Sequence, residues 1–163
     1  MPTIRLQPID PERFETTLER AAAQYADEQV RAGRWSAGEA AERARKALAQ
    51  LLPRGVNTPN HHLLDIVDDG TGEIVGTLWY AEKRADGPPH AYVYDIQILD
   101  EHRRRGCACA AFARLEERVR EAGLGSIRLN VYGHNDAARS LYEKLGFEPV
   151  SIVMRKDLTR SKS

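Results

Sequence analysis

The chain of 163 residues lacks several features that would assign its class at once. No apolar run approaches the ~20 residues that a membrane-spanning helix needs. The first residues, Met1 to Arg5, contain no hydrophobic core of a signal peptide. Lysine and arginine total 24 and so do aspartate and glutamate, which leaves none of the basic excess that marks nucleic-acid binders. We therefore expect a cytoplasmic protein with no membrane partner and no nucleic-acid partner.

Cysteine is also scarce. Cys107 and Cys109 are the two cysteines of the chain, and they lie two residues apart. On a helix such a pair points in different directions, which disfavours a disulfide. Without a cluster of histidines beside them they cannot complete a zinc site, so no metal is expected. We interpret both as small thiols that are buried or half-buried.

The composition that remains is that of a globular protein, with 42% hydrophobic and 29% charged residues. A chain of this length corresponds to about one domain, since single domains cluster at roughly 100–200 residues. Such a chain buries a core without disulfides or metals. We predict a single domain over residues 1–158 and a polar tail over residues 159–163.

Local signals predict four helices. Asp10-Pro11-Glu12 combines an N-cap, a proline at the first helical position and an acid in the first turn. Ser36 and Glu39 have the spacing of a capping box. The expected helices run from Asp10 to Gly33, from Ser36 to Pro53, from Arg105 to Ala122, and from Asn135 to Gly146.

Stretches of alternating or β-branched residues predict the strands. They are Thr3 to Ile9, His62 to Val67, Ile74 to Ala81, Ala91 to Leu99, Ile127 to Val131, and a final strand from Pro149 to Leu158. The turn residues 68–72 favour an antiparallel hairpin, whereas the strand–helix–strand order of the second half implies a parallel crossover. We predict a mixed α/β (α+β) fold with helices on both faces of the sheet.

The segment that joins a predicted strand to a predicted helix, Arg103 to Ala108, is the first candidate site. Backbone N–H groups at a helix start bind phosphates, and Gly106 allows close approach because it has no Cβ. Three consecutive arginines add cationic donors. An ordinary turn with solvated arginines is the alternative. The chain contains neither a P-loop nor a dinucleotide-binding fingerprint.

The second candidate site is the helix that begins after Asn135. Asn135 is a good N-cap, and Tyr142 lies two helical turns further on the same face. A core tyrosine whose hydroxyl finds a partner is the alternative interpretation of Tyr142.

Together the two segments resemble motifs of the GNAT superfamily of acyl-CoA-dependent N-acyltransferases. Arg103, Gly106 and Ala108 match its Q/R-x-x-G-x-G/A turn. The second motif, N-x-x-A-x-x-x-Y-x-x-x-G-F, is matched by Asn135, Ala138, Tyr142, Gly146 and Phe147. The resemblance covers residues from about His62 to Leu158. It implies a mostly antiparallel mixed sheet in which one parallel pair of strands splays apart at a bulge.

The resemblance implies acetyl-CoA as co-substrate and direct attack by an amine, with no metal and no covalent enzyme intermediate. The backbone of the central strand would pair with the pantetheine arm, and the turn would cradle the pyrophosphate. The implied contacts are Ile96, Gln97, Ile98, Arg103, Arg104, Arg105, Gly106, Cys107, Ala108, Cys109, Asn135, Ala138 and Tyr142. The hydroxyl of Tyr142 would protonate the departing thiolate.

The general base is less clearly implied. The position where family members often carry Glu or His holds Asn130, and another frequent position holds Tyr92. Asp95 is a carboxylate in an apolar strand, and burial suits a base because it disfavours the charged form. A hydrogen-bonded structural aspartate is the alternative, and His134 is interpreted as an exposed turn residue. We expect the amine proton to leave through water near Asp95, Tyr92 and Asn130.

The predicted function is therefore an N-acetyltransferase that acts on a primary amine of a protein N-terminus, a lysine or a small molecule. A longer acyl donor and a non-catalytic acyl-CoA-binding regulatory module are the alternatives. Only about ten residues follow Glu148 before the tail, fewer than the hairpin that walls the acceptor site in many family members. The acceptor site is then either open or completed by a partner chain in a homodimer. Tyr25, Trp35 and the loop through His61 are expected to form its other wall.

Overall fold

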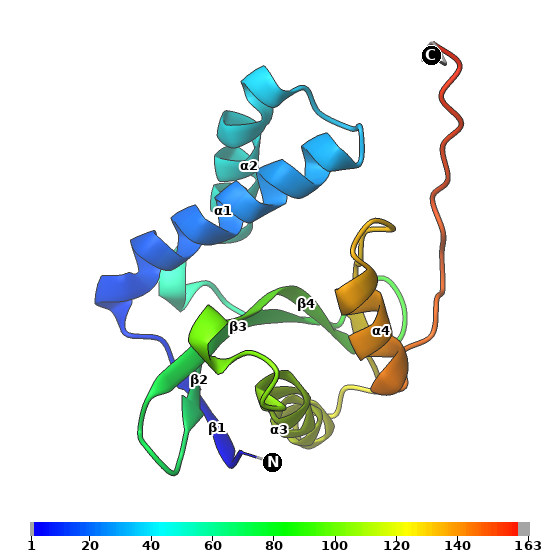
Figure 1. Ribbon diagram of the computed structural model, residues 1–163. Helices are drawn as coiled ribbons and strands as arrows, with labels where there is room; N and C mark the ends of the chain where they lie inside the picture. Colours follow the sequence, from blue (N-terminus) through cyan, green and yellow to red (C-terminus); the bar gives the residue numbers. More distant parts are fainter. Residues whose placement is uncertain (1, 160–163) are drawn as a thin grey trace.

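The computed structural model describes residues 2–159, so the predicted tail lies outside the described residues except for Thr159. Its elements follow the expected order (Figure 1). They are β1 (Ile4–Pro8), α1 (Phe14–Arg31), α2 (Ala37–Leu51), β2 (His61–Asp68), β3 (Ile74–Lys83), β4 (His90–Ile98), α3 (Cys107–Glu121), β5 (Ile127–Leu129) and α4 (Asp136–Lys144). Short 3-10 turns precede α1, β2 and α3.

Within residues 2–159 the strands form one sheet in the order β1-β2-β3-β4-β5. The first four strands pair antiparallel, and β5 pairs parallel with β4. β4 and β5 can pair in parallel because α3, which connects them in sequence, carries the chain back across one face of the sheet. The predicted mixed, mostly antiparallel sheet is confirmed.

Helices cover both faces of the sheet, as predicted (Figure 1). On one face α3 packs its apolar stripe, which includes Phe112 and Leu115, against the even-numbered side chains Leu64 and Ile66 of β2. On the other face α1 and α2 bury alanines and Leu48 against Leu63 and Trp79. No helix in the described range is long and apolar enough to span a bilayer.

A bulge in β4 opens the sheet where the site lies. Trp79 is opposite Asp95 while Tyr80 is opposite Val93, so Tyr94 is an extra residue in the ladder. The pairing of β4 with β5 ends at Val93 and Leu129. Beyond that point β4 continues to Ile98 with β3 as its neighbour, and its other edge is open toward the α4 side. The splayed parallel pair implied by the resemblance is therefore present.

Four local predictions differ from the structure. The strand predicted for Ile127 to Val131 ends at Leu129. The final strand predicted for Pro149–Leu158 is wrong, because the segment is extended but pairs with no strand in the described chain. The α3 helix begins at Cys107 rather than Arg105, since Arg104 and Gly106 adopt positive φ. Ser36 occupies the N-cap of α2, but its side chain makes no capping hydrogen bond.

Candidate functional site

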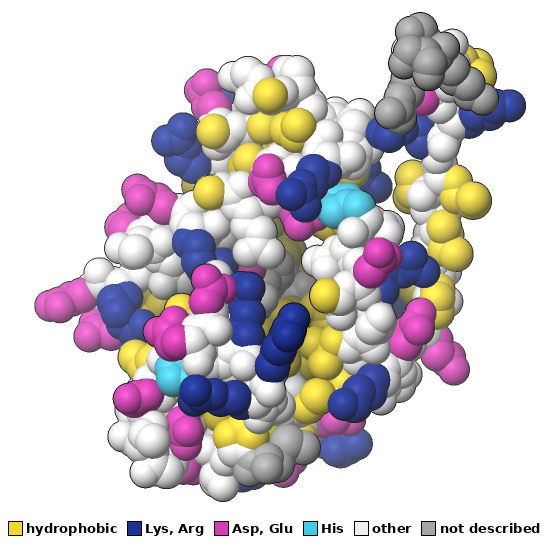
Figure 2. All heavy atoms as spheres, viewed as in Figure 1, with side chains coloured by type: hydrophobic (Ala, Val, Ile, Leu, Met, Phe, Trp, Pro, Cys, Tyr) yellow, Lys and Arg dark blue, Asp and Glu magenta, His cyan; other side chains and the backbone are white. Residues whose placement is uncertain are grey.

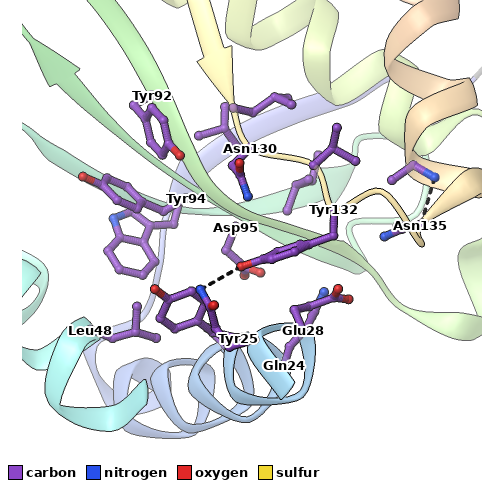
Figure 3. Close-up of a pocket in the computed structure, with 18 of the residues that line it drawn as sticks. Gln24, Tyr25, Glu28, Leu48, Tyr92, Tyr94, Asp95, Asn130, Tyr132 and Asn135 are labelled. Atoms are coloured by element: carbon purple, nitrogen blue, oxygen red, sulfur yellow. Dashed lines mark hydrogen bonds between the residues drawn. The ribbon is translucent and has the colours of Figure 1, made fainter. Parts of the chain in front are cut away.

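A cleft of about 450 Å³ lies between α1 and the diverging ends of β4 and β5 (Figure 3). In Figure 2 the surface is hollowed between the helices at the top of the view and the α4 side of the molecule. The lining includes Tyr25, Glu28, Gln29, Trp79, Tyr92, Tyr94, Asp95, Ile96, Leu129, Asn130, Tyr132, Asn135, Ala138 and Tyr142.

The open edge of β4 forms one side of the cleft. Ile96 lines it directly, and Ile96, Gln97 and Ile98 pair with β3 on their other side. A strand edge of this kind presents N–H and C=O groups that an extended ligand can pair with. Arg103 donates from Nε to the Ile98 carbonyl (3.0 Å), which ties the turn after β4 to the end of that edge.

The turn before α3 presents backbone N–H groups. Arg104 has φ 62° and Gly106, the N-cap of α3, has φ 80°. A non-glycine residue at positive φ is strained, and such strain clusters at functional sites. Two left-handed residues on either side of Arg105, next to a helix N-terminus, form a concavity that suits an anion.

The two cysteines belong to this helix start and are both free thiols. Cys107 is buried and Cys109 is half-buried, as expected. Burial, followed by the charge of Asp68, raises the pKa of the Cys107 thiol. A thiol of raised pKa stays protonated at neutral pH and is a poor nucleophile.

Tyr142 projects from α4 into the cleft. Its ring packs edge-on against Phe112 (5.8 Å between centroids) and Phe147 (5.5 Å), so packing fixes its orientation. Burial, and then the negative charge of Asp95, raises the pKa of Tyr142. The phenol therefore holds its proton at neutral pH, as a general acid must. Its catalytic role stays a prediction.

Asn135 is the N-cap of α4, as predicted. Its Oδ1 accepts from the backbone N–H of Ala138 (3.0 Å), and both residues line the cleft (Figure 3). Because the cap uses the amide oxygen of Asn135, the amide NH₂ is left as the group that can donate to a ligand.

Asp95 lies on the α1 side of the sheet and lines the cleft. Its Oδ2 pairs with Nη2 of Arg20 (2.6 Å), and the same nitrogen reaches the Thr77 hydroxyl at 3.2 Å. The carboxylate of Asp95 is therefore already paired. This arrangement corresponds to the hydrogen-bonded structural aspartate, which was the alternative to a general base in the sequence analysis. Tyr92 and Asn130 line the same cleft from neighbouring strands, and the base itself stays a prediction.

Two contacts between α1 and the segment after β5 were missed by the sequence analysis. Nε2 of Gln29 donates to the Tyr132 hydroxyl (3.2 Å), and Glu28 Oε2 lies 2.5 Å from His134 Nε2. His134 was interpreted as an exposed turn residue, and besides its contact with Glu28 it stacks on Tyr132 (5.7 Å). The spacing of Tyr25, Glu28 and Gln29 on one helix face is the signal that could have identified this wall.

Gln29 is 5% exposed, and its Oε1 has no hydrogen-bond partner in the described structure. Burying an unpaired polar atom costs free energy, so this oxygen is a ready acceptor for a donor that enters the cleft. Burial also raises the pKa of Tyr132 to about 12, so its hydroxyl is a neutral partner for Gln29.

Aromatic rings of β3 and β4 form an aromatic wall of the cleft. Trp79 stacks on Tyr94 (4.9 Å), which stacks on His61 (5.7 Å). Trp79 donates from Nε1 to Nδ1 of His61 (3.0 Å), and burial lowers the pKa of His61. Of the expected wall, Tyr25 lines the cleft, His61 packs against Tyr94 without lining it, and Trp35 packs behind Tyr25 (5.2 Å).

Comparison with known proteins places this geometry among acetyltransferases. Residues 23–147 match the family model described as acetyltransferase (GNAT) family. The N-acetyltransferase YycN of Bacillus subtilis (strain 168) is 36% identical over 156 residues, which are 96% of this chain and 99% of YycN. The N-acetyltransferase YdgE of the same organism is 31% identical over 153 residues, or 94% of this chain and 97% of YdgE.

Solved structures of acetyltransferases have the same fold as this chain. The crystal structure of YycN from Bacillus subtilis superposes with a TM-score of 0.90 at 35% identity, covering 97% of this chain and 100% of that one. An acetyltransferase structure from Pyrococcus furiosus shares the fold, with a TM-score of 0.64 at 24% identity over 95% of this chain and 99% of that one.

Proposed function

The chain belongs to the GNAT acetyltransferase family and is an acyltransferase, and from that premise we propose that it transfers the acetyl group of acetyl-CoA to a primary amine. The amine belongs to a protein N-terminus, a lysine or a small molecule. The partners in this proposal are the amine and, in a homodimer, a second copy of the chain.

The observation that carries the proposal is the placement of three features in and beside one cleft. The open edge of β4 at Ile96 and the side chain of Tyr142 line the cleft. The positive-φ turn before α3 follows the end of that edge and is tied to it by the hydrogen bond from Arg103 to the Ile98 carbonyl. Their chemistry fits acetyl-CoA, because an extended amide-containing arm can pair with the edge and an anionic pyrophosphate with the turn. Ile96 to Ile98 and Arg103 to Cys109 would hold these parts, with Asn135 and Ala138 beside them.

In the proposed reaction, acetyl-CoA supplies an activated thioester. The neutral amine attacks its carbonyl carbon, a C–N bond forms, and the C–S bond breaks. The departing thiolate takes a proton from the phenol of Tyr142, which regains one from solvent. The nitrogen loses one proton, so the products are an amide and the free thiol of CoA. The residues of the chain orient both substrates and move the two protons.

We keep water near Tyr92, Asp95 and Asn130 as the route of the amine proton, since all three line the cleft. The ion pair with Arg20 suits Asp95 to holding such a water, because the pair fixes the carboxylate in place. Glu28 lines the cleft too, and its contact with His134 makes this pair a second acceptor for the proton. Aromatic faces and carboxylates together attract a cationic amine before it loses its proton.

Release of CoA with a panel of amines is the direct test, and Tyr142→Phe is its sharpest variant. General acid catalysis contributes ~10²–10⁴-fold, so we expect kcat to fall about tenfold or more. The affinity for acetyl-CoA should change little, because the ring still packs against Phe112 and Phe147. A variant with wild-type kcat, when chemistry limits the rate, would remove Tyr142 from the mechanism. Absence of CoA release with every amine class would refute the proposed activity.

A further inference from the structure

Gln29 places an unpaired hydrogen-bond acceptor in the wall of the cleft. Its side chain is buried, it lines the cleft, and its Oε1 has no hydrogen-bond partner in the described structure. Roughly 90% or more of buried polar groups in proteins are paired, so an exception requires an explanation. Leaving the oxygen unpaired costs free energy, which a ligand with a hydrogen-bond donor would recover. The buried oxygen therefore indicates a ligand that donates to it.

A donor lies next to this acceptor. The Tyr132 hydroxyl accepts from Nε2 of Gln29 (3.2 Å), and this hydrogen bond is the dashed line that ends at Tyr132 in Figure 3. A hydroxyl can accept and donate at the same time. The hydrogen of the Tyr132 hydroxyl has no acceptor among the described residues. Oε1 of Gln29 and the O–H of Tyr132 are therefore an acceptor and a donor side by side on the cleft wall.

Contacts from both walls of the cleft hold the two side chains in place. The backbone carbonyl of Gln29 accepts from the N–H of Arg34 (3.0 Å), which joins the end of α1 to the loop that follows it. The ring of Tyr132 stacks on His134, whose Nε2 lies 2.5 Å from Oε2 of Glu28. A pair that is already ordered loses little conformational freedom when a ligand binds.

The surroundings of the pair favour a neutral ligand group over an ion. Glu28 and Arg34 both line the cleft and carry opposite charges, and the Glu28 carboxylate already contacts His134. An ammonium group at Oε1 of Gln29 would lose its water and gain a single neutral acceptor, which is costly. An extended peptide meets the requirement without charge, because the N–H and the C=O of one residue point to the same side.

We propose that Gln29 and Tyr132 bind one backbone residue of a peptide-type acceptor. The N–H of that residue donates to Oε1 of Gln29, and its carbonyl accepts from the Tyr132 hydroxyl. The inference rests on the proposed acetyl transfer and narrows its acceptor to amines that carry a peptide backbone. The α-amine of a peptide and the side chain of a lysine within one both belong to this class, whereas a simple alkylamine does not.

The first experiment measures CoA release with matched acceptors. Alanyl-alanine methylamide is compared with the depsipeptide in which an ester oxygen replaces the N–H of the second residue. Both keep the reacting amine and the carbonyls, so the ratio of their kcat/KM values reports the N–H alone. The wild-type protein should favour the peptide by about tenfold or more, and Gln29→Met should bring the ratio close to one. A wild-type ratio near one, or an unchanged ratio in Gln29→Met, would overturn the proposal.

A second pair of acceptors identifies the source of the amine. Nα-acetyl-lysine methylamide is compared with the analogue in which an ester oxygen replaces its α N–H. If the ratio that Gln29→Met removes is larger for this pair, the acceptor is a lysine within a peptide. If it is larger for the alanyl pair, the acceptor is a peptide N-terminus. Either result supports the backbone site, and equal rates with pentylamine and both peptides would refute it.

Gln24→Met is the matched control. Gln24 lies on the same helix and lines the cleft, but its Oε1 already accepts from Nη1 of Arg20 (3.4 Å). The ratio of the two alanyl acceptors should therefore keep its wild-type value. Because each ratio is taken within one variant, a loss of folded protein cancels from it. A ratio near one in Gln24→Met as well would remove the assignment to Gln29.

Calorimetry with the same alanyl acceptors separates this inference from the proposed activity, because binding requires no turnover. The wild-type protein should bind the peptide more tightly than the depsipeptide, and Gln29→Met should bind both alike. Tighter peptide binding without CoA release would refute the acetyl transfer and leave the backbone site in place. CoA release together with equal affinities, or with no binding of either acceptor, would refute the backbone site alone.

Discussion

Gly76 in β3 sets the distance at which β4 lies, and Gly76→Ala is the sharpest structural test of the cleft. A Cβ at this position would lie 2.1 Å from the carbonyl oxygen of Gln97 and 3.1 Å from Cα of Ile98. Both are backbone atoms of the strand whose other edge is open to the cleft, so no side chain can move to relieve the contact. The two strands must separate by more than 1 Å to restore an ordinary contact of about 3.4 Å.

Overpacking of this kind costs about 1–3 kcal/mol. For a chain of this size each kcal/mol shifts Tm by about 2–4 °C, so calorimetry should show a Tm lower by roughly 2–12 °C. The displaced edge should also weaken the acetyl-CoA affinity, and kcat/KM should fall by as much as ~10²-fold, the cost of about 1 Å of misplacement.

Gly38→Ala is the matched control for this change. Gly38 lies in α2 with nothing within 4 Å of its added Cβ, so the alanine should stabilise the helix by about 1 kcal/mol without affecting catalysis. Wild-type Tm and wild-type acetyl-CoA affinity in Gly76→Ala would refute the tight approach of β3 and β4.

Three further changes test the turn before α3, the half-buried carboxylate of Asp95 and the aromatic wall. Gly106→Glu places a negative charge beside the N–H groups of the turn, so calorimetry should show loss of acetyl-CoA binding. The control variant Gly106→Ala has the same positive-φ strain but no charge and should keep most of the affinity. Equal acetyl-CoA affinities in the two variants would refute the site. Asp95→Asn removes the charge opposite Arg20 and should lower kcat/KM, and near-normal activity in this variant would exclude Asp95 from the proton route. Burial lowers the pKa of His61 in the folded state, so as pH falls the unfolded state takes up this proton at a higher pH than the folded state does. The free energy of unfolding should therefore fall as pH drops below about 6.5. His61→Gln keeps an acceptor for Trp79 and should reduce this slope of Tm against pH, whereas an unchanged slope would assign it to other groups.

The order of helices and strands could be predicted because it depends on local patterns. The alternation in β4, the apolar stripe of α3 and the Asn135 cap each lie within a few residues. The parallel pairing of β5 follows from the crossover rule rather than from any contact. The composition of residues 149–158 predicted a final strand, but a strand also needs a neighbouring edge to pair with, and the local pattern carries no information about that edge.

The site could be predicted only where family motifs mark it. The turn at Gly106 and the helix position of Tyr142 were located in this way, and the structure places Tyr142 in the lining of the cleft and Gly106 at the start of α3 after the open edge of β4. The ion pair of Asp95 joins residues 75 apart, and the Gln29–Tyr132 hydrogen bond joins residues 103 apart. Such pairs depend on the packing of α1 over the sheet, which one sequence does not specify.

The aromatic wall gives the protein an optical signal of its own. Of its two tryptophans, Trp79 lines the cleft and is 5% exposed, whereas Trp35 lies beneath the guanidinium of Arg43 (4.5 Å) outside that lining. A ligand that enters the cleft changes the surroundings of one indole and leaves the other nearly as it was. In a Trp35→Phe variant, the tryptophan fluorescence would come from the cleft alone. Amines and acyl donors can therefore be titrated against unlabelled protein, and binding can be separated from turnover before any product is detected.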